Sequence, residues 1–550
     1  MYSNKENVNI LTSLLVKYGV EHIVVCPGSR NAPLVHNFNE CPDIICHPAT
    51  DERSAGFIAI GLRQTLHQPV AVCVTSGSAL LNVLPAVAEA TMQQSGIIVI
   101  SADRPQAWIG QLDGQTLPQP GAMGAFVGKS VSLPEPHDDV ERWYCNRLIC
   151  EAMIANLTGG YPSVHINVPI TEPLFEFTVK ELPDERKMAY ATWSDEDVRE
   201  SLMESLRVAK RPMIVIGQVS NGELPDDYYD ELSNHIVVLT EQLAVASQTF
   251  TDQMLYAIQK QPEQYQPDFI VYMGGNTISK RLRQFLRSLD ATQIVVTGDG
   301  AISDVSEHTS MVIKGNVYEV FADINGFISY IRKPDEFCKR WAALRNNVKA
   351  KHNAFSPDFS SMLAVKLFEE QMDGGDFVYY ANSMAVRLGA IYARHYILCN
   401  RGVNGIEGSL SVAAGAALAA AERYDCNVYC VIGDLSFFYD ENALWQQQLG
   451  GNFRILLLNN GQGGIFRNLK GLEQSAARDA YIAAGHTTSA KGICTQFGVK
   501  YLKATDQNSL LKGIQTLTQE DSDRPILLEV KTSAKQDEDV FKEYYQHLRQ

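Results

Sequence analysis

The chain has 550 residues, of which 45% are hydrophobic and 20% are charged, and its formal net charge at pH 7 is −16. This length predicts two to four domains, because a single hydrophobic core stops growing well below this size, and the composition is that of a globular protein. The acidic balance argues against nucleic acid as the main partner, since binding phosphates requires a basic surface. Anionic small molecules remain possible, because they respond to local charge.

The first apolar stretch, residues 10–16, is short, is interrupted by polar residues and lacks a small-residue cleavage site. We therefore expect an ordinary helix there and no signal peptide. No run approaches the roughly 18 apolar residues that a membrane span needs. The eleven cysteines form no C-x-x-C motif, which predicts reduced thiols in a cytoplasmic protein.

Short apolar runs alternate with amphipathic segments of helical length along the whole chain, which is typical of βαβ units and parallel sheets. The first set of predicted strands is 22–25, 69–75, 96–101 and 163–168. A polar stretch at about 180–198 precedes the second set, which is 212–217, 235–239, 269–273 and 293–297. Another polar stretch at about 351–358 precedes the third set, which is 376–380, 397–399, 428–432, 454–458 and 525–530. We predict an α/β protein of three doubly wound parallel-sheet domains, at residues 1–185, 186–352 and 353–550.

Two neighbouring strands of the third predicted domain end in oxygen-bearing side chains. Strand 428–432 runs into Gly433-Asp434, and strand 454–458 runs into Asn459-Asn460, where Asn460 comes 26 positions after Asp434. Ligands of open parallel sheets bind beyond the carboxyl ends of the strands. A carboxylate, an amide oxygen and a backbone carbonyl near Gln462 would suit Mg²⁺, which keeps phosphate oxygens as further ligands.

The segment after Asp434 predicts a helix whose free N–H groups favour phosphate, although Ser436 could equally be an ordinary N-cap. The second predicted domain offers an internal control. Asp299 also follows a strand, but 26 positions later the chain has Asn325-Gly326, without a paired asparagine or a preceding apolar strand. We interpret Gly298-Asp299-Gly300 as a plain turn.

The G-D-x-S motif followed by N-N resembles the metal–diphosphate signature of thiamine diphosphate enzymes. The three-domain layout resembles the pyrimidine-binding, central and diphosphate-binding domains of that superfamily. Further segments narrow the resemblance: CPGSRNAPL, TSGSALLNVLPAVAEA, SADRPQ, GQTLPQPGAM, SKRL, NSMAVRL and NRGVNGIEGSLSVAAG. Together they resemble the 2-succinyl-5-enolpyruvyl-6-hydroxy-3-cyclohexene-1-carboxylate synthase family of menaquinone biosynthesis.

This resemblance implies an enzyme that decarboxylates 2-oxoglutarate and adds the remaining four-carbon unit to isochorismate by conjugate addition, releasing CO₂. It implies thiamine diphosphate with Mg²⁺ or Mn²⁺, and a homodimer or homotetramer with active sites between subunits. Two alternatives stay open. The crowd of arginines argues against another 2-oxoacid carboligase, such as an acetohydroxyacid synthase-like enzyme, and the presence of Glu52, Asp434 and Asn460 argues against a non-catalytic binding protein of the same fold.

The resemblance also implies roles for individual residues. Glu52 would share a proton with the aminopyrimidine ring of the cofactor, whereas without the resemblance it would pair with Arg53 or cap a helix. Ile406 would keep the cofactor bent, although core packing would explain an isoleucine equally well. The implied cofactor-binding residues are Pro27, Glu52, Asn82, Ile406, Gly433, Asp434, Leu435, Ser436, Asn460, Gln462, Gly463 and Ile465. The implied metal ligands are Asp434, Asn460 and Gln462.

Both implied substrates are dicarboxylates, and arginine binds a carboxylate through two N–H groups at once. The implied substrate-binding residues are Ser29, Arg30, Arg104, Gln115, Lys280, Arg281, Ser383, Arg387, Arg401 and Phe466. Of these, Ser383 and Arg387 would hold the succinyl carboxylate, and Arg30, Arg104 and Arg401 are placed for isochorismate. The chain departs from the family at Gly114, where asparagine is common, and at Gln462, where glycine is common.

Overall fold

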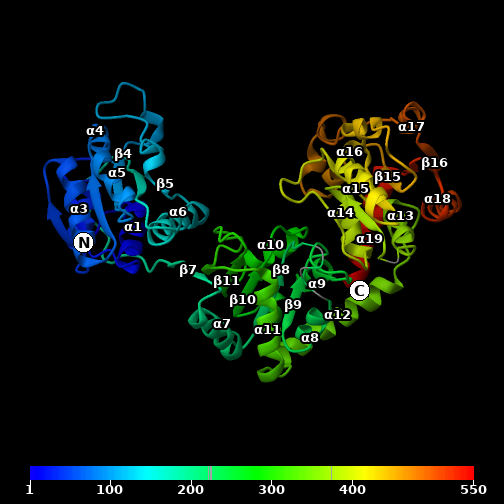
Figure 1. The fold of residues 1–550 in the computed structure, drawn as a ribbon, viewed down its shortest axis with the longest axis horizontal. Coiled ribbons are helices and arrows are strands. Elements are labelled where there is room, and N and C mark those ends of the chain that lie inside the picture. Colours follow the sequence, from blue (N-terminus) through cyan, green and yellow to red (C-terminus); the bar gives the residue numbers. More distant parts are fainter. Residues whose placement is uncertain (221, 223, 225, 373, 550) are drawn as a thin grey trace. The chain divides into compact units, whose positions relative to one another are not determined.

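In the computed structural model the chain forms two compact units, residues 1–191 with 302–312 and residues 192–301 with 313–550. The structure describes residues 1–550 except 221, 223, 225, 373 and 550. The described residues form three parallel sheets flanked by helices (Figure 1), which confirms the predicted α/β class. The domain boundaries at 185/186 and 352/353 stay predictions.

The first sheet has the strand order β2-β1-β3-β4-β6-β5. Its strands are β1 His22–Val25, β2 Ile45–Pro48, β3 Val70–Val74, β4 Ile98–Asp103, β5 Lys129–Ser132 and β6 Val164–Pro169. Its helices are α1 Glu6–Lys17, α2 Ala32–Glu40, α3 Glu52–Leu66, α4 Ser78–Asn82, α5 Leu84–Met92 and α6 Asp139–Leu157. Ile23 and Val25 pack in one core with α1, α2 and α6, and Val24 packs in another with α3 and α5. The alternation follows from the two-residue period of a strand.

The second sheet has the order β7-β12-β11-β10-β8-β9. Its strands are β7 Ala189–Thr192, β8 Pro212–Ile216, β9 Val237–Thr240, β10 Phe269–Met273, β11 Thr292–Thr297 and β12 Thr309–Lys314. Its helices are α7 Glu196–Val208, α8 Asp226–Ser233, α9 Thr251–Ala257, α10 Lys280–Arg287, α11 Val317–Ile331 and α12 Glu336–Ala354. Asp299 accepts a hydrogen bond from the Ala301 N–H at 2.9 Å in a turn, and Asn325 lies within α11. The interpretation of Asp299 as part of a plain turn is confirmed.

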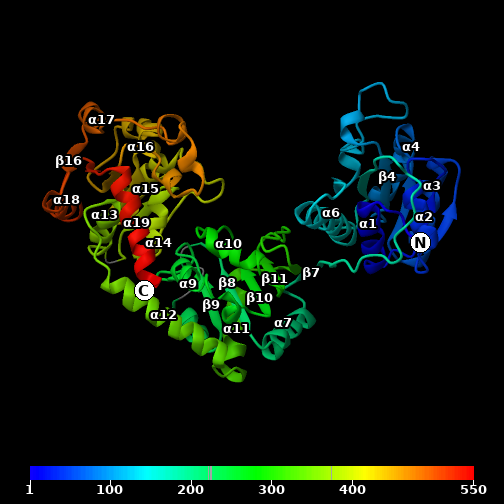
Figure 2. The same ribbon diagram turned by 180° about the vertical axis from the view of Figure 1, so that it is seen from behind.

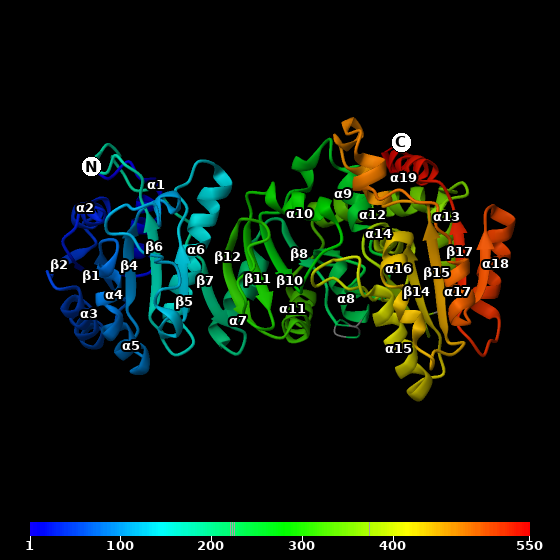
Figure 3. The same ribbon diagram turned by 90° about the horizontal axis from the view of Figure 1, so that it is seen from above.

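The third sheet has the order β13-β14-β15-β17-β16, of which β14, β15 and β17 can be followed side by side in Figure 3. Its strands are β13 Phe377–Tyr380, β14 Val428–Gly433, β15 Phe453–Asn459, β16 Lys500–Ala504 and β17 Ile526–Lys531. Its helices are α13 Ser361–Glu369, α14 Met384–Tyr392, α15 Ser409–Arg423, α16 Asp434–Tyr439, α17 Lys491–Phe497, α18 Gln507–Gln519 and α19 Ala534–Arg549. The last helix, α19 (red in Figure 2), packs against α9, α12 and α13. Strands β14 and β15 are parallel neighbours with Gly433 opposite Leu458, so Asp434 and Asn460 follow adjacent strand ends.

Several expectations were wrong in detail. Residues 397–399 form only an isolated bridge from Leu398 to Tyr379. The polar stretch at 180–198 contains β7 and the start of α7, and α12 continues through residue 354. Helix α15 leaves Val412 44% exposed. None of the described helices has the length and hydropathy needed to cross a bilayer.

Candidate functional site

The carboxylate of Asp434 joins the ends of β14 and β15. Asp434 is only 3% exposed. Its Oδ1 accepts a hydrogen bond from the Leu435 N–H and its Oδ2 accepts one from the Gly461 N–H, both at 2.8 Å. Gly461 has φ +84°, a conformation that glycine adopts without strain. The alternative for Ser436 is wrong, because α16 begins at Asp434 and its N-cap is Gly433.

The two adjacent asparagines have different partners. The Asn459 side chain is buried and donates to Glu529 Oε1 at 2.6 Å and to the Thr488 carbonyl at 2.9 Å. The Asn460 side chain donates through Nδ2 to Asp537 Oδ2 at 2.9 Å. This bond orients the Asn460 amide, whose Oδ1 accepts, within the described residues, a single 3.3 Å hydrogen bond from the Gln462 N–H. The Asn459 side chain therefore holds Thr488 and Glu529 at the end of β15, and the Asn460 Oδ1 can still bind a cation.

The Gln462 side chain is engaged away from the strand ends. In its satisfied amide orientation its oxygen accepts from the Arg467 guanidinium, at 3.3 Å from Nη2. Arg467 in turn forms ion pairs with Asp479 at 3.2 Å and Glu538 at 3.4 Å. This arrangement leaves the Gln462 backbone carbonyl as the group that could reach a cation. Within the described chain, no group of three or more His, Cys, Asp or Glu side chains could hold a metal.

A cavity of about 420 Å³ brings together most of the predicted site residues of the second unit. Its lining includes Ser383, Arg387, Arg401, Ile406, Gly433, Asp434, Leu435, Ser436, Asn460, Gln462, Gly463, Ile465 and Phe466. A neighbouring cavity of about 560 Å³ is lined by the other two, Lys280 and Arg281, and shares Arg387 and Ile465 with the first. The predicted residues of the second unit therefore line two adjoining spaces.

The loop at the end of β13 is strained. Ser383 has φ +72°, which is unusual for a residue with a Cβ. The preceding Asn382 donates through Nδ2 to the carbonyls of Asn400 and Gly405, both at 2.8 Å, and its Oδ1 accepts from Arg401 at 3.0 Å. These bonds fix the two loops that carry Ser383 and Ile406. Ile406 is 39% exposed at the cavity wall, so it is not a core residue in this chain.

Arg387 and Arg401 have no carboxylate partner among the described residues. Arg401 is buried, and its Nη2 donates to the Thr277 carbonyl at 2.9 Å. Its Nε is also buried and has no hydrogen-bond partner in the described part of the chain. Arg387 donates only a long bond, 3.4 Å, to the Ile278 carbonyl. Burial lowers the pKa of Arg401, the charges of Arg387 and Arg283 act in the same direction, and Cys399 and Glu241 only partly oppose them. A bound anion would supply the missing countercharge.

Arg281, by contrast, already has a carboxylate partner. It forms a hydrogen-bonded ion pair with Asp252, which also accepts a hydrogen bond from the Tyr545 hydroxyl at 2.7 Å. The guanidinium lies 4.9 Å from the ring centre of Tyr256 and 4.5 Å from that of Tyr545. The Arg281 guanidinium is thus held in one orientation, whereas the neighbouring Lys280 side chain is exposed.

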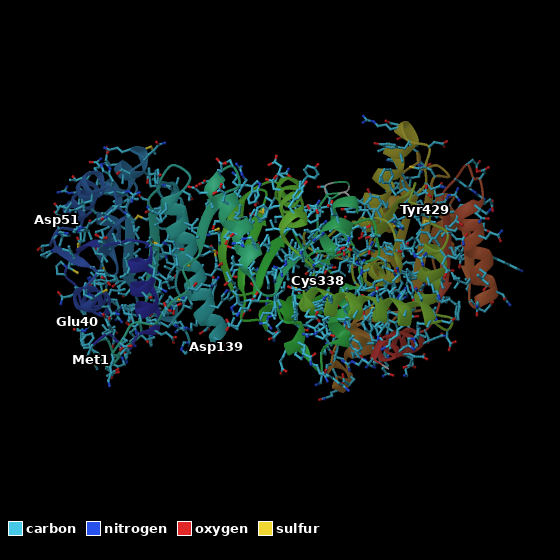
Figure 4. The ribbon with its side chains drawn as sticks, turned by 90° about the horizontal axis from the view of Figure 1, so that it is seen from below. Met1, Glu40, Asp51, Asp139, Cys338 and Tyr429 are labelled. Carbon is cyan, nitrogen blue, oxygen red and sulfur yellow. The ribbon has the colours of Figure 1, made fainter. Side chains whose placement is uncertain are left out.

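In the first unit, Glu52 is the first residue of α3, and its Oε2 accepts a hydrogen bond from Asn82 at 3.1 Å. The two ordinary alternatives for Glu52 are excluded. Asp51, exposed and labelled in Figure 4, supplies the N-cap by accepting from the Ser54 N–H at 3.2 Å. Arg53 pairs with Asp51 at 3.9 Å instead of with Glu52. Two predicted cofactor-binding residues, Glu52 and Asn82, therefore contact each other.

The other predicted residues of this unit lie on loops at strand ends. Pro27 and Ser29 are exposed after β1. The buried Arg30 donates to the Ile170 carbonyl at 2.9 Å and pairs with Glu172 at 3.0 Å. Arg104 donates to the Gly114 carbonyl at 3.2 Å and pairs with Asp113 at 3.5 Å and with Glu172 at 3.8 Å. Both arginines share the carboxylate of Glu172.

Gln115 lies on the loop after β4, with φ +56°. The buried Gln119 ties this loop to the sheet, because its Oε1 accepts from the Gly77 N–H at 2.7 Å and its Nε2 donates to Asn167 Oδ1 at the same distance. Sequence reasoning missed Gln119, and it also missed Glu172, Asp252, His486 and Asp537. Gln119 lies inside the segment GQTLPQPGAM, but the others belong to no segment that marked the site.

Known protein families match both ends of the chain, and known proteins match it over nearly its whole length. The model of the thiamine pyrophosphate enzyme N-terminal TPP-binding domain matches residues 6–123, and that of the C-terminal TPP-binding domain matches residues 376–530. The chain is 41% identical over 566 residues to the 2-succinyl-5-enolpyruvyl-6-hydroxy-3-cyclohexene-1-carboxylate synthase of Bacteroides fragilis, with 100% of both chains covered. The synthase of the same name from Phocaeicola vulgatus is 41% identical, over 100% of this chain and 99% of its own. That of Flavobacterium psychrophilum is 33% identical over 96% of both chains.

Proposed function

The chain belongs to the 2-succinyl-5-enolpyruvyl-6-hydroxy-3-cyclohexene-1-carboxylate synthase family, and we propose that it makes this compound from 2-oxoglutarate and isochorismate with release of CO₂. It is a thiamine diphosphate-dependent enzyme of menaquinone biosynthesis. One observation carries the choice of substrates. Arg387 and Arg401 line the cavity beside Asp434 and lack carboxylate partners among the described residues, which suits dicarboxylate substrates.

The residues at the ends of β14 and β15 fit a diphosphate with its cation. Asp434 would supply a carboxylate oxygen, Asn460 its Oδ1 and Gln462 its backbone carbonyl. Mg²⁺ or Mn²⁺ would complete its coordination with oxygens of the diphosphate and water, as hard cations do at phosphate sites. Leu435, Ser436, Gly463 and Ile465 line the same cavity and would enclose the cofactor.

Bound thiamine diphosphate supplies an electron sink for the pair of electrons left when CO₂ departs from a 2-oxoacid. The role of Glu52 is to hold a proton at Oε2 for the aminopyrimidine ring nitrogen and to take it back. Asn82 orients this oxygen by donating to it at 3.1 Å. Ile406, exposed in the cavity, would press against the cofactor and keep water out.

We assign the substrate carboxylates to the arginines by their free hydrogen-bonding capacity. Arg387 and the Ser383 hydroxyl would bind the carboxylate of 2-oxoglutarate remote from the reacting carbon. Arg401 would bind isochorismate through its unpartnered buried Nε–H, together with Lys280. Arg30, Arg104 and Gln115 of a partner chain would complete the isochorismate site, and Phe466 would pack against the ring.

The enzyme acts as a homodimer or homotetramer in this proposal, with Glu52 of one chain serving the cofactor held by Asp434 of another. Apolar side chains exposed on the single chain support it. Phe57 and Ile58 on α3 are 45% and 44% exposed, and Val412 on α15 is 44% exposed. Exposed apolar groups next to site residues are typical of protein interfaces. Two-fold pairing would bury the same patch on both chains and would create two equivalent sites. The free cysteines and the biosynthetic role favour the cytoplasm.

The direct test incubates the purified protein with thiamine diphosphate, Mg²⁺ and 2-oxoglutarate, with and without isochorismate. We expect a product whose mass equals that of 2-oxoglutarate plus isochorismate less CO₂. It should form only when both substrates are present. Release of CO₂ without any joined product would contradict the proposed acceptor. A parallel incubation with pyruvate in place of 2-oxoglutarate should give no joined product, and a product formed from pyruvate alone would contradict the proposed donor.

A further inference from the structure

A buried histidine nitrogen without a partner faces the predicted metal ligand. The Nε2 of His486 lies 3.4 Å from Asp434 Oδ2. This nitrogen is buried and makes no hydrogen bond within the described part of the chain. Leaving a buried donor unsatisfied costs about 1–3 kcal/mol, so native proteins rarely leave one without a reason. The acceptor at 3.4 Å belongs to the carboxylate that the proposed function assigns to the cation.

The surroundings of the ring determine which nitrogen carries the proton. Nδ1 of His486 accepts a hydrogen bond from the Thr488 N–H at 3.1 Å. An acceptor nitrogen carries no proton, so the neutral ring has its N–H at Nε2. The ring nitrogen that carries the proton is therefore the one that lies 3.4 Å from Asp434 Oδ2.

The position of the ring is fixed by strand ends and by packing. The backbone N–H of His486 donates to the Gly461 carbonyl at 2.8 Å, and the ring lies edge-on to Phe438 with centroids 5.4 Å apart. Two residues further on, the Thr488 carbonyl accepts from Asn459 at 2.9 Å and from Lys531 at 3.1 Å. The end of β15 thus holds His486 against Asp434, so the unsatisfied donor is not a consequence of a loose loop.

We propose that His486 is a positioning residue for the cation, and this inference rests on the proposed function of Asp434. The Nε2–H would donate to Asp434 Oδ2 once the cation draws the carboxylate into place. Together with the N–H groups of Leu435 and Gly461, it would hold Asp434 so that its remaining lone pairs point at the cation. Partners of this kind orient a metal ligand without touching the metal, and their loss typically weakens metal binding about 10–100-fold.

Two nearly matched amide variants test the role of this one nitrogen. In His486→Gln the amide nitrogen can take the place of Nε2, whereas in His486→Asn the shorter side chain reaches only the place of Nδ1. Calorimetric titration with thiamine diphosphate at a series of Mg²⁺ concentrations gives the Mg²⁺ concentration for half-maximal cofactor binding. We expect His486→Asn to raise it about 10–100-fold, and His486→Gln to stay close to the unmodified protein.

Three results would overturn the inference. The first is an unchanged Mg²⁺ requirement in His486→Asn, and the second is an equal rise in both variants. The third is a lower unfolding temperature of His486→Asn alone, measured without cofactor and cation, because it would indicate a merely structural role. Asp434→Ala in the same titration separates this inference from the proposed function. If that variant binds the cofactor with a normal Mg²⁺ requirement, the metal site itself is misassigned.

Discussion

Ser383 and Gly77 share one unusual backbone conformation. Ser383 has φ 72° and ψ −127°, and Gly77 has φ 81° and ψ −138°. Each residue immediately precedes a helix that follows a strand, α14 in one case and α4 in the other. This conformation suits glycine, but for a residue with a Cβ it costs about 1–3 kcal/mol. Ser383 therefore keeps a side chain at a strained position, and this side chain lines the cavity.

Replacement of Ser383 by glycine should stabilise the protein while weakening the substrate site. We expect Ser383→Gly to raise the free energy of unfolding by about 1 kcal/mol, because relief of strain exceeds the added entropy of the unfolded chain. The KM for 2-oxoglutarate should rise as the hydroxyl is lost. Urea unfolding and steady-state kinetics measure the two effects. A lower stability of Ser383→Gly would show that Ser383 is not strained. Gly77→Ala is the matched control, and it should lower the stability.

Arg387→Ala should impair 2-oxoglutarate binding much more than cofactor binding. Removing one partner of a desolvated charge pair costs about 2–5 kcal/mol, which should appear mainly as a higher KM. Lys512→Ala removes a positive charge from the exposed face of α18 and is the control. Kinetics for 2-oxoglutarate that do not change in Arg387→Ala would rule out its assignment.

Asp434→Ala should abolish Mg²⁺-dependent binding of thiamine diphosphate, because the diphosphate would lose the cation that bridges it to the protein. Asp299→Ala provides a control from the same chain, since Asp299 also follows a parallel strand but only closes a turn. Titration of each variant with the cofactor, with and without Mg²⁺, should separate them. Equal affinity in the two variants would show that the strand-end motif had been misinterpreted.

Two inactive variants should restore activity when they are expressed together. If Glu52 serves the cofactor of the partner chain, a mixed dimer of Glu52→Gln and Asp434→Ala has one site with both lesions and one with neither. Random pairing makes roughly half of the dimers mixed, so about a quarter of the unmodified activity should return. An inactive mixture, with mixed dimers confirmed by mass, would be incompatible with shared sites.

Stability should fall on the alkaline side because of His395. Burial by itself would lower the pKa of His395, but the hydrogen bond and charge of Glu369, 2.9 Å away, raise it above the usual value. The unfolded chain has a histidine pKa of about 6.5. The contribution of protonated His395 to the free energy of unfolding is thus fully present below about pH 6.5 and is lost as the pH rises through the pKa of the folded protein. Urea midpoints between pH 5.5 and 9 should show the loss, and His395→Gln should flatten the profile. An identical profile in that variant would exclude His395 as the cause.

The sequence predicted the buried strands well and the exposed ones poorly. Residues 22–25 and 269–273 coincide with β1 and β10, because an unbroken apolar run is a strong signal. Of the missed strands, β2, β5, β7 and β16 are at sheet edges, whereas β12 lies between β7 and β11 but is only partly buried. An edge strand is partly exposed and need not be apolar, so its pairing depends on neighbours that the sequence does not reveal.

The same limit applies to the site. Asp434 and Asn460 could be found because each directly follows an apolar strand. Asp537 and His486 could not, since they reach the site from a late helix and an irregular loop, and their contacts depend on tertiary packing. Nor could the sequence show that Arg281 is paired with Asp252 whereas Arg401 has no carboxylate partner in the described chain.

The two kinds of arginine should respond differently to salt. A substrate that reaches Arg30 or Arg104 competes with Glu172, so one anion replaces another and little net charge is neutralised. At Arg387 and Arg401 the substrate would neutralise cations whose hydrogen bonds in the described chain go to carbonyl and amide oxygens, without an ion pair. Attraction between such uncompensated charges is screened by dissolved ions. The contribution of Arg387 and Arg401 to substrate affinity should therefore decline with ionic strength more steeply than the contribution of Arg30 and Arg104.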